Sequence, residues 1–416
     1  MFKYLRFISL LILFQSAQIQ AQLPTQTLDY FLKQGLENSP LLRDYQNQLS
    51  SSTIDSLLIK AGQEPKVDAN AQVLYAPVYH NFGYDEASTN GGNYTGVVGI
   101  SQNFLNQKEL RNKYESVEIQ KRSVSNTFKI SYNDLTRIIT AQYLNAFADF
   151  SDLTFNKNFL KLMEDQQAIL KKLVESGIYK QTDYLSLLIE TQTQEITLKQ
   201  ASSQYYKDLL LLYQLCGLND TSHTDLATPI IHRKNLDDVA QSPLLAQFKI
   251  DSLKISNSRS AVDVLYRPKL NWFADAGLLS TSPSTLYQHF GYSAGINFSI
   301  PIYDGKQRKL QYRKLDFTED TRSNYEHFFK KQYSQQIMQL KSDLATAEET
   351  LDQLKKQQKT AEDLMTMVKS LLNTGNISIT EFINATKNYD AINRTLNQTQ
   401  IKILQTINEL NYWMQQ

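Results

Sequence analysis

The stretch GYSAGINFSIPIYDGKQRKL, from Gly291 to Leu310, changes its hydrophobic period partway along and thereby decides the fold. Up to Ile300, apolar and polar residues alternate, which is typical of a strand with one apolar and one polar face. Pro301 ends strand pairing because it lacks an N–H, and Asp304 and Gly305 precede a long helical pattern. The sequence therefore predicts a strand-to-helix junction at Pro301, Asp304 and Gly305.

The same alternation occurs elsewhere, and in each half of the chain a polar loop separates two alternating segments. The strands that we expect cover residues 66–77, 94–104, 268–279 and 290–301. Strands of about 9 to 11 residues have the height needed in an outer-membrane barrel. The alternative is a small soluble β-sheet that caps a helical body.

The remainder of the chain is helical, with apolar residues at seven-residue spacing. After the junction, one seam contains Ile337, Leu344, Leu351, Met365 and Leu372, and the other contains Leu340, Ala347, Leu354, Ala361 and Val368. Gln358 is the polar interruption in the first seam. This spacing predicts coiled-coil packing of long helices.

The chain consists of two copies of one unit. SGIYKQTDYL (176–185) overlays TGNISITEFI (374–383), which pairs Gly177 with Gly375 and Asp183 with Glu381. We expect a first structural repeat over 22–220 with a helical hairpin turn near 177. A second repeat over 241–416 has its turn near 375, and residues 221–240 form an equatorial connector between the repeats.

Composition and targeting exclude several classes of protein. Residues 1–21 have the charged start, apolar run and small final residue of a removable signal peptide. No later run approaches the ~20 apolar residues of a membrane helix, so an exported membrane protein of this sequence enters the bilayer as β-structure. With 43 Lys and Arg against 42 Asp and Glu, the net charge of +1 gives no field that recruits nucleic acid.

The sequence contains no recognisable set of catalytic, cofactor-binding or metal-binding residues. The five histidines are His80, His223, His232, His289 and His327. They show neither HExxH nor i,i+4 metal spacing, and the single Cys216 cannot form an internal disulfide. Phosphate-loop, dinucleotide and nucleophile-elbow motifs are also missing from the sequence. We therefore expect no enzyme activity, no cofactor and no bound metal.

Four strands cannot close a barrel alone, because the smallest membrane barrels need ~8 strands and open edges are costly in lipid. Three copies related by a threefold axis would supply twelve strands above a ring of helices. The expected fold class is mainly α with membrane β: a long coiled-coil helical barrel with four strands per chain, an internal twofold repeat, and closure as a trimeric 12-stranded barrel.

The repeat, the strand opening RPKLNWFADAGL (267–278), the junction SIPIYDGKQR (299–308) and the hairpin turns resemble the TolC-like outer-membrane efflux protein family. This resemblance implies a passive homotrimeric duct through the outer membrane and periplasm of a Gram-negative bacterium, in contact with outer-membrane lipid. It also implies a periplasmic adaptor (membrane fusion protein) and an inner-membrane transporter of the RND, ABC or MFS type. The duct would serve a tripartite efflux pump or type I secretion system.

The resemblance also implies roles for the hairpin turns. The family pattern Gly-x5-Asp-x2-Asp falls on Gly375, Glu381 and Asn384, so Glu381 keeps a carboxylate of the family's periplasmic acidic ring and Asn384 departs from it. Asp183 matches an acid that links neighbouring helices. The family's basic and tyrosine gate partners fall on Ile377 and Leu372, so the closing latch must differ. The adaptor-docking turns correspond to Ser176, Gly177, Ile178, Thr374, Gly375 and Asn376.

Each of these residues also has a purely structural interpretation. Glu381 suits a helix start, where the macrodipole favours an acid, whereas three such carboxylates on one axis would raise the apparent pKa of the set. Gly177 and Gly375 suit left-handed turn positions. A rival hypothesis for the whole chain is a periplasmic coiled-coil adaptor or scaffold protein that does not span the membrane.

Overall fold

The computed structural model describes residues 26–77, 79–80, 82–85, 91–234 and 242–414. The expected signal peptide and connector residues 235–240 lie outside this part of the chain. The structure divides into two compact units. The helix-turn unit contains residues 1–42, 130–242 and 331–416, and the sheet unit contains residues 43–129 and 243–330. Each unit therefore draws on both sequence repeats.

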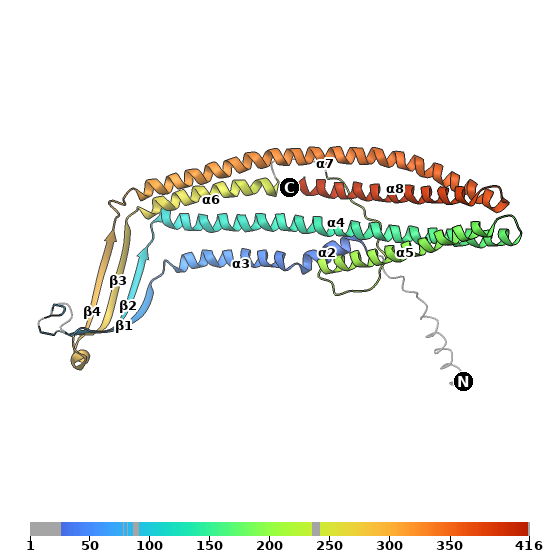
Figure 1. Ribbon diagram of the computed structural model, residues 1–416. Helices are drawn as coiled ribbons and strands as arrows, with labels where there is room; N and C mark the ends of the chain where they lie inside the picture. The colour runs from blue at the N-terminus through green and yellow to red at the C-terminus, as the bar shows by residue number, and fades with distance from the viewer. Residues whose placement is uncertain (1–25, 78, 81, 86–90, 235–241, 415–416) are drawn as a thin grey trace, which may run out of the picture. The chain divides into compact units, whose positions relative to one another are not determined.

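Long helices dominate the chain (Figure 1). They are α2 (Leu28–Asn38), α3 (Pro40–Ala61), α4 (Gln107–Glu175), α5 (Gln181–Leu215), α6 (Pro243–Leu265), α7 (Gln307–Thr374) and α8 (Ile379–Trp413). The strands are β1 (Lys66–Tyr75), β2 (Gly92–Phe104), β3 (Lys269–Ser280) and β4 (Phe290–Ser299), with a short 3-10 helix, η2 (Pro283–Gln288), between β3 and β4. The predicted combination of long helices and four strands is confirmed. None of the helices in the described part of the chain combines the length and apolar character that a bilayer crossing requires.

The sheet unit holds one antiparallel sheet in the order β1-β2-β3-β4. Its register aligns residues of like polarity across all four strands: Ala69 pairs with Val98, Val98 with Ala276, and Ala276 with Tyr292. Paired residues point to the same face of a sheet, and alternate residues point to opposite faces. One face is therefore almost wholly apolar, while the other is mainly polar: it carries Lys, Asp, Asn, Ser, Thr, Gln and Gly, together with Leu74, Val97, Phe273 and Leu279.

Gln102 is a polar residue on the apolar face, and its amide is used within the chain. Its Oε1 accepts a hydrogen bond from Trp272 Nε1 at 3.0 Å, and its Nε2 donates to the carbonyl oxygen of Gln63 at 2.8 Å. Satisfying both ends of a side-chain amide removes most of the cost of placing it on an apolar surface.

The sequence SPLL, which occurs at 39–42 and 242–245, starts a helix in both repeats. Pro40 and Pro243 are the first residues of α3 and α6, where a missing N–H costs nothing. Ser39 Oγ accepts the N–H of Leu42 at 3.4 Å. The helical path is therefore broken between α2 and α3, because the residue before proline is driven into extended backbone.

The helix-turn unit has a core of aromatic and aliphatic side chains that holds α2 on α4 and α5. Phe31, Tyr143 and Tyr213 are almost completely buried there. Tyr143 Oη donates to the carbonyl oxygen of Ala227 at 2.6 Å, and a bridge pairs Gln26 with Leu226. The segment around Thr224 to Ala227 thus lies against this core, and Cys216 is buried in it.

The coiled-coil seams are also found in the helix-turn unit. Leu340, Leu344, Leu354, Ala361, Val368 and Leu372 are buried on α7. Gln358, the predicted polar interruption, donates to Asn393 Oδ1 of α8 at 2.9 Å. A polar pair inside an apolar seam fixes the register of two helices, because sliding by one turn would leave both amides without partners.

Candidate functional site: the paired helix turns

Two short turns carry most of the residues predicted to have a functional role. Turn 1 (residues 176–180) joins α4 to α5, and turn 2 (residues 375–378) joins α7 to α8. Gly177 and Gly375 both have φ of 75°. Glycine adopts this left-handed conformation without the Cβ penalty that other residues pay.

Both turns close their preceding helix with the same pair of hydrogen bonds. In turn 1 the Ile178 N–H reaches the Leu173 carbonyl oxygen at 2.9 Å, and in turn 2 the Asn376 N–H reaches that of Leu371 at 3.0 Å. The glycine N–H groups supply the inner bonds of these Schellman caps. The sequence repeat is thus a repeat of cap geometry.

Glu381 caps the start of α8. Its Oε2 accepts the Ser378 N–H at 3.1 Å and the Ser378 hydroxyl at 2.9 Å, while Ser378 Oγ accepts the Glu381 N–H at 3.2 Å. This is a complete capping box. The backbone and side-chain hydrogen bonds from Ser378 hold the pKa of Glu381 below its usual value.

Asp183 makes one of the two capping-box hydrogen bonds at the start of α5 in the first repeat. It accepts the Lys180 N–H at 3.0 Å, but Lys180 has no acceptor atom with which to return the bond. The hydrogen bond of Asp183 therefore goes to its own helix start. Asn384 is exposed on α8, three residues beyond Glu381. Within one chain, Glu381 and Asp183 therefore bind their own helix starts, and Asn384 is exposed to solvent.

The two turns contact each other. Tyr179 Oη of turn 1 donates to the Ile377 carbonyl oxygen of turn 2 at 2.7 Å. Ile178 packs against Gly375, where an added Cβ would lie 2.5 Å from Ile178 Cγ2. Turn 1 and turn 2 are therefore joined by a hydrogen bond and by close packing.

A cluster of buried side chains lies next to the two turns. It includes Leu187 of α5, Leu372 of α7 and Phe382 of α8, all nearly or fully buried. Leu372 and Ile377 occupy the positions where the resembled family carries gate partners. Here Leu372 fills the core, and Ile377 offers its carbonyl oxygen to Tyr179.

Ion pairs connect the two hairpins further along the helices. Lys387 of α8 lies 2.7 Å from Glu190 of α5. Arg394 of α8 lies 3.2 Å from Asp152 of α4 and also donates to Asn156 at 2.8 Å. The sequence did not indicate Tyr179, Lys387 or Arg394 as connecting residues, because each has its partner in the other repeat.

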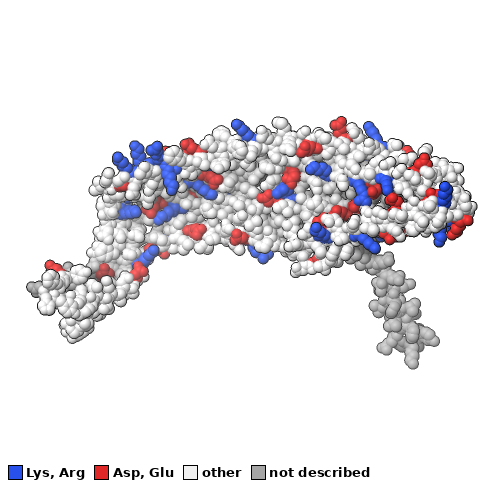
Figure 2. All heavy atoms as spheres, in the orientation of Figure 1, with Lys and Arg blue, Asp and Glu red and all other residues white. Residues whose placement is uncertain are grey.

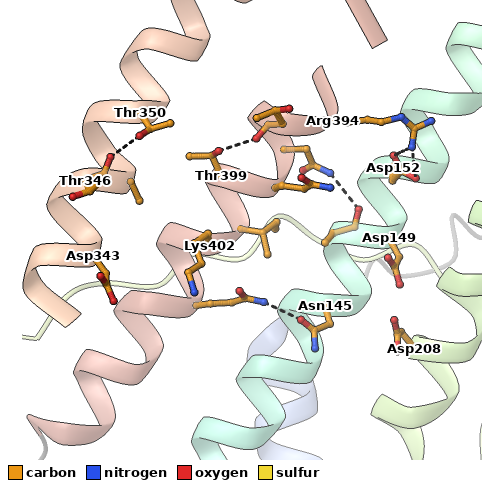
Figure 3. Close-up of a pocket in the computed structure, with 17 residues that line it drawn as sticks. Asn145, Asp149, Asp152, Asp208, Asp343, Thr346, Thr350, Arg394, Thr399 and Lys402 are labelled. Carbon is orange, nitrogen blue, oxygen red and sulfur yellow. Dashed lines mark hydrogen bonds and ion pairs between the residues drawn. The ribbon is translucent and has the colours of Figure 1, made fainter. Parts of the chain in front are cut away.

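Beside Arg394 lies a groove of about 1000 Å³ (Figure 3). Thr346 and Thr350 of α7 lie on one side of it, and Asp149 and Asp208 approach each other on the other side. Burial raises the pKa of Asp149 to about 7, and a hydrogen bond to Asp208 contributes. Burial alone would raise the pKa of Asp208, but hydrogen bonds from Asp149, Gln204 and Gln142 outweigh it and lower that pKa. Two carboxyl groups can share a hydrogen bond when one of them is protonated.

The predicted strand-to-helix junction lies in the sheet unit. After Pro301, the Asp304 carboxylate accepts the N–H groups of Lys306 at 2.9 Å and Arg308 at 2.7 Å. Gly305 and Lys306 both have positive φ, of 66° and 70°. Asp304 thus starts α7, and these hydrogen bonds hold its pKa below the usual value.

Among the described residues, no group of three or more His, Cys, Asp or Glu side chains could hold a metal ion. The residues that the structure brings together are therefore those of helix caps, turn contacts and ion pairs. Such an arrangement joins the two hairpins.

The fold matches solved outer-membrane proteins. A membrane protein from Pseudomonas aeruginosa is 12% identical, with a TM-score of 0.76 over 96% of this chain and 95% of that chain. The outer membrane protein VceC from Vibrio cholerae is 11% identical, with a TM-score of 0.76 over 93% of this chain and 95% of that chain. The open state of the Neisseria gonorrhoeae MtrE outer membrane channel is 12% identical, with a TM-score of 0.74 over 93% of this chain and 88% of that chain.

No protein-family model and no curated protein sequence matches the chain. The similarity is therefore one of fold. At that level the predicted resemblance is confirmed, and the chain has the fold of TolC-like outer-membrane channels.

Proposed function

We propose that this protein is a passive duct in the outer membrane of a Gram-negative bacterium, extending into the periplasm. The observation that carries the proposal is the register of the sheet, which gives four strands one continuous apolar face and one polar face. In a membrane barrel the apolar face meets lipid and the polar face lines a water-filled lumen. The solved channels that share the fold support this assignment.

Closure of the sheet would require other copies of the chain. Within the described residues, β1 and β4 are the edges of the sheet, and an open edge in lipid leaves backbone groups without partners. Joining β4 of one copy to β1 of the next, three times, gives a homotrimer with a twelve-stranded barrel. A ring formed by one repeated head-to-tail contact has no free edge left.

The paired helix turns would form the periplasmic entrance. In this proposal Ser176, Gly177 and Ile178, with Thr374, Gly375 and Asn376, meet a periplasmic adaptor that couples the duct to an inner-membrane transporter. Glu381 would present a ring of three carboxylates around the axis, next to Asn384. The bonds from Tyr179, Lys387 and Arg394 to the other repeat would act as the latch between the hairpins.

Membrane fractionation followed by mass determination of the detergent-extracted, unheated protein tests the duct. Recovery in the outer membrane at three times the protomer mass is the expected result. A soluble periplasmic monomer would overturn the proposal and favour the adaptor or scaffold alternative, with the apolar sheet face buried against protein.

Assignment to a tripartite efflux pump or to type I secretion is a further step. Chemical crosslinking from a cysteine at position 176 or 376, followed by identification of the captured chain, distinguishes the two. Capture of an adaptor encoded with an efflux transporter supports a pump, whereas capture of a secretion adaptor supports export of a protein. Gly177→Cys is avoided, because φ of 75° disfavours any side chain there.

A further inference from the structure

The segment that follows β4 is exposed, first apolar and then basic. Ile302 is 97% exposed and Tyr303 is 83% exposed. Lys306 directly precedes α7, and the first turns of α7 carry Lys309 and Arg313; all three are exposed. We propose that this segment binds the phosphate headgroups of anionic phospholipid where the sheet leaves the bilayer. This inference rests on the proposed function, in which the sheet crosses the outer membrane.

Two of the basic residues share one face of α7. At 3.6 residues per turn, Lys309 and Arg313 lie about 40° apart around the helix, and Lys306 precedes them in the turn that starts it. Leu310 and Phe317, each 61% exposed, lie on the same face. The Arg313 guanidinium is 5.8 Å from the centroid of the Phe317 ring. The face thus combines apolar surface with positive charge.

Three acids close to the start of this face are already bonded elsewhere, and one of them, Asp316, pairs with Arg259. Asp304 accepts backbone N–H groups, and Asp263 binds Arg308, which lies on the opposite side of α7. Among the described residues, Lys306, Lys309, Arg313 and Lys314 form no ion pair with a carboxylate. Figure 2 shows Lys and Arg side chains gathered where α7 begins beside the sheet. The positive charge is therefore available to a ligand.

The order of side chains fits a bilayer surface. The apolar row Phe104, Leu270 and Phe298 lies in register at the end of the sheet nearest the helices. Ile302 and Tyr303 follow it, and then the basic residues. Aromatic rings favour the headgroup level, and Lys and Arg extend apolar stems with the charge toward phosphate. Anionic lipid headgroups attract such clusters within about a Debye length.

Two other basic residues at the sheet do not belong to this surface. Lys66 and Lys269 lie on the polar face of their strands, in register with Ser101 and Ser299. They would face the lumen. The lipid contact is therefore assigned to the start of α7 alone.

The test compares three full-length proteins reconstituted into phosphatidylcholine vesicles that contain spin-labelled phosphatidylglycerol or spin-labelled phosphatidylcholine. They are the wild type, the variant K306Q/K309Q/R313Q, and the control K355Q/K356Q/K359Q. The control removes the same charge from exposed positions of the same helix, far from the sheet in sequence. The measurement is the ratio of motionally restricted phosphatidylglycerol to phosphatidylcholine.

For the wild type and the control we expect phosphatidylglycerol to be favoured by about threefold or more. For K306Q/K309Q/R313Q we expect a ratio near one with the assembly mass unchanged. Inorganic phosphate should compete no better than sodium chloride of equal ionic strength, because the ligand is a headgroup held at a surface. Stronger competition by phosphate would instead indicate a site for the free anion and overturn the lipid assignment.

Three other results would overturn it. They are a wild-type ratio near one, equal loss of selectivity in the control, or dissociation of the assembly in K306Q/K309Q/R313Q, which would make this face a contact between chains. Failure of the wild type to insert into either vesicle would reject the duct itself. Insertion without lipid selectivity would reject the headgroup site alone.

Discussion

Ile178 of the first repeat lies directly over Gly375 of the second, so that a Cβ at position 375 would lie 2.5 Å from Ile178 Cγ2. The equivalent glycine, Gly177, has the same φ of 75° but open space around the position of its missing Cβ. The sequence repeat is thus symmetric in backbone and asymmetric in packing. The second turn requires glycine both for its positive φ and for the close contact with Ile178, whereas the first turn requires it for the positive φ alone.

This asymmetry predicts unequal costs for the same substitution. Gly177→Ala should destabilise its turn by about 1 to 2 kcal/mol, the cost of a left-handed alanine. Gly375→Ala should cost about 1 to 3 kcal/mol more, because Ile178 must move. Hydrogen exchange of residues 173–182 for Gly177→Ala, and of residues 371–380 for Gly375→Ala, measures the two effects. The excess should largely vanish in an Ile178→Ala background, and an undiminished excess would show that the contact is not its cause.

Tyr179→Phe should weaken the contact between the turns. It removes the hydroxyl that donates to the Ile377 carbonyl oxygen at 2.7 Å, at a cost of about 1 kcal/mol. If this bond belongs to the latch, single-channel recordings in planar bilayers should show more frequent opening. Tyr184→Phe is the matched control, because its hydroxyl contacts Gln167 within the first repeat. Equal effects of both variants would argue against a latch at Tyr179.

The pH dependence of conductance should show whether Glu381 acts mainly as a helix cap or as part of a ring of carboxylates. Hydrogen bonds from Ser378 lower its pKa, so its capping contribution is present above the unfolded-state value of about 4.3 and is lost as pH falls through the lower folded pKa. A ring of three carboxylates would instead titrate at higher pH, because like charges raise the pKa. Conductance of Glu381→Gln compared with Ser378→Ala, recorded across pH and cation concentration, separates these cases. Indistinguishable profiles for Glu381→Gln and wild type would remove the residue from the gate.

Asp149 should make the helix-turn unit less stable as pH rises. Its folded-state pKa of about 7 exceeds the unfolded value near 3.9, so the folded state binds the proton more tightly. Its stabilising contribution is complete below about pH 4 and is lost as pH rises through 7. Asp149→Asn should flatten this slope, with a gain on the order of 1 kcal/mol at high pH once solvent screening is included.

Thermal unfolding of the detergent-extracted protein between acidic and mildly alkaline pH provides the measurement for Asp149. Asp343→Asn, on α7 across the same groove, is the control. A slope that survives in Asp149→Asn would assign the pH dependence to other groups.

Local patterns were enough to predict the elements of the fold. The two faces of each strand follow from a period of two. The register satisfies this period on both sides of β2, because Val98 pairs with Ala69 of β1 and with Ala276 of β3. The α7 seam follows from a period of seven, and its residues are buried except Ala347 and Leu351, which are half-buried. The break before Pro40 is local in origin too, because proline disfavours helix in the preceding residue.

The candidate site was less accessible to sequence reasoning. Glu381 could be recognised as a cap, because Ser378 and Glu381 have the spacing of a capping box. The partners of Tyr179 and Arg394 could not be recognised from the sequence. Ile377 lies 198 residues from Tyr179, and Asp152 lies 242 residues from Arg394. No periodic pattern encodes such a pair, and the side chains that join the repeats have no common residue type.

The two free edges of the sheet have a consequence for biogenesis. In the proposed duct, a chain that reached the periplasm alone would carry an apolar sheet face and two edge strands, β1 and β4, whose outer sides have no strand partner within the described residues, a combination that favours aggregation. Edge pairing between copies would remove that hazard, so strand folding and chain association would be a single event. The rate of maturation should then depend steeply on how many newly exported copies are present at once, and a periplasmic chaperone would have to protect each copy while it waits.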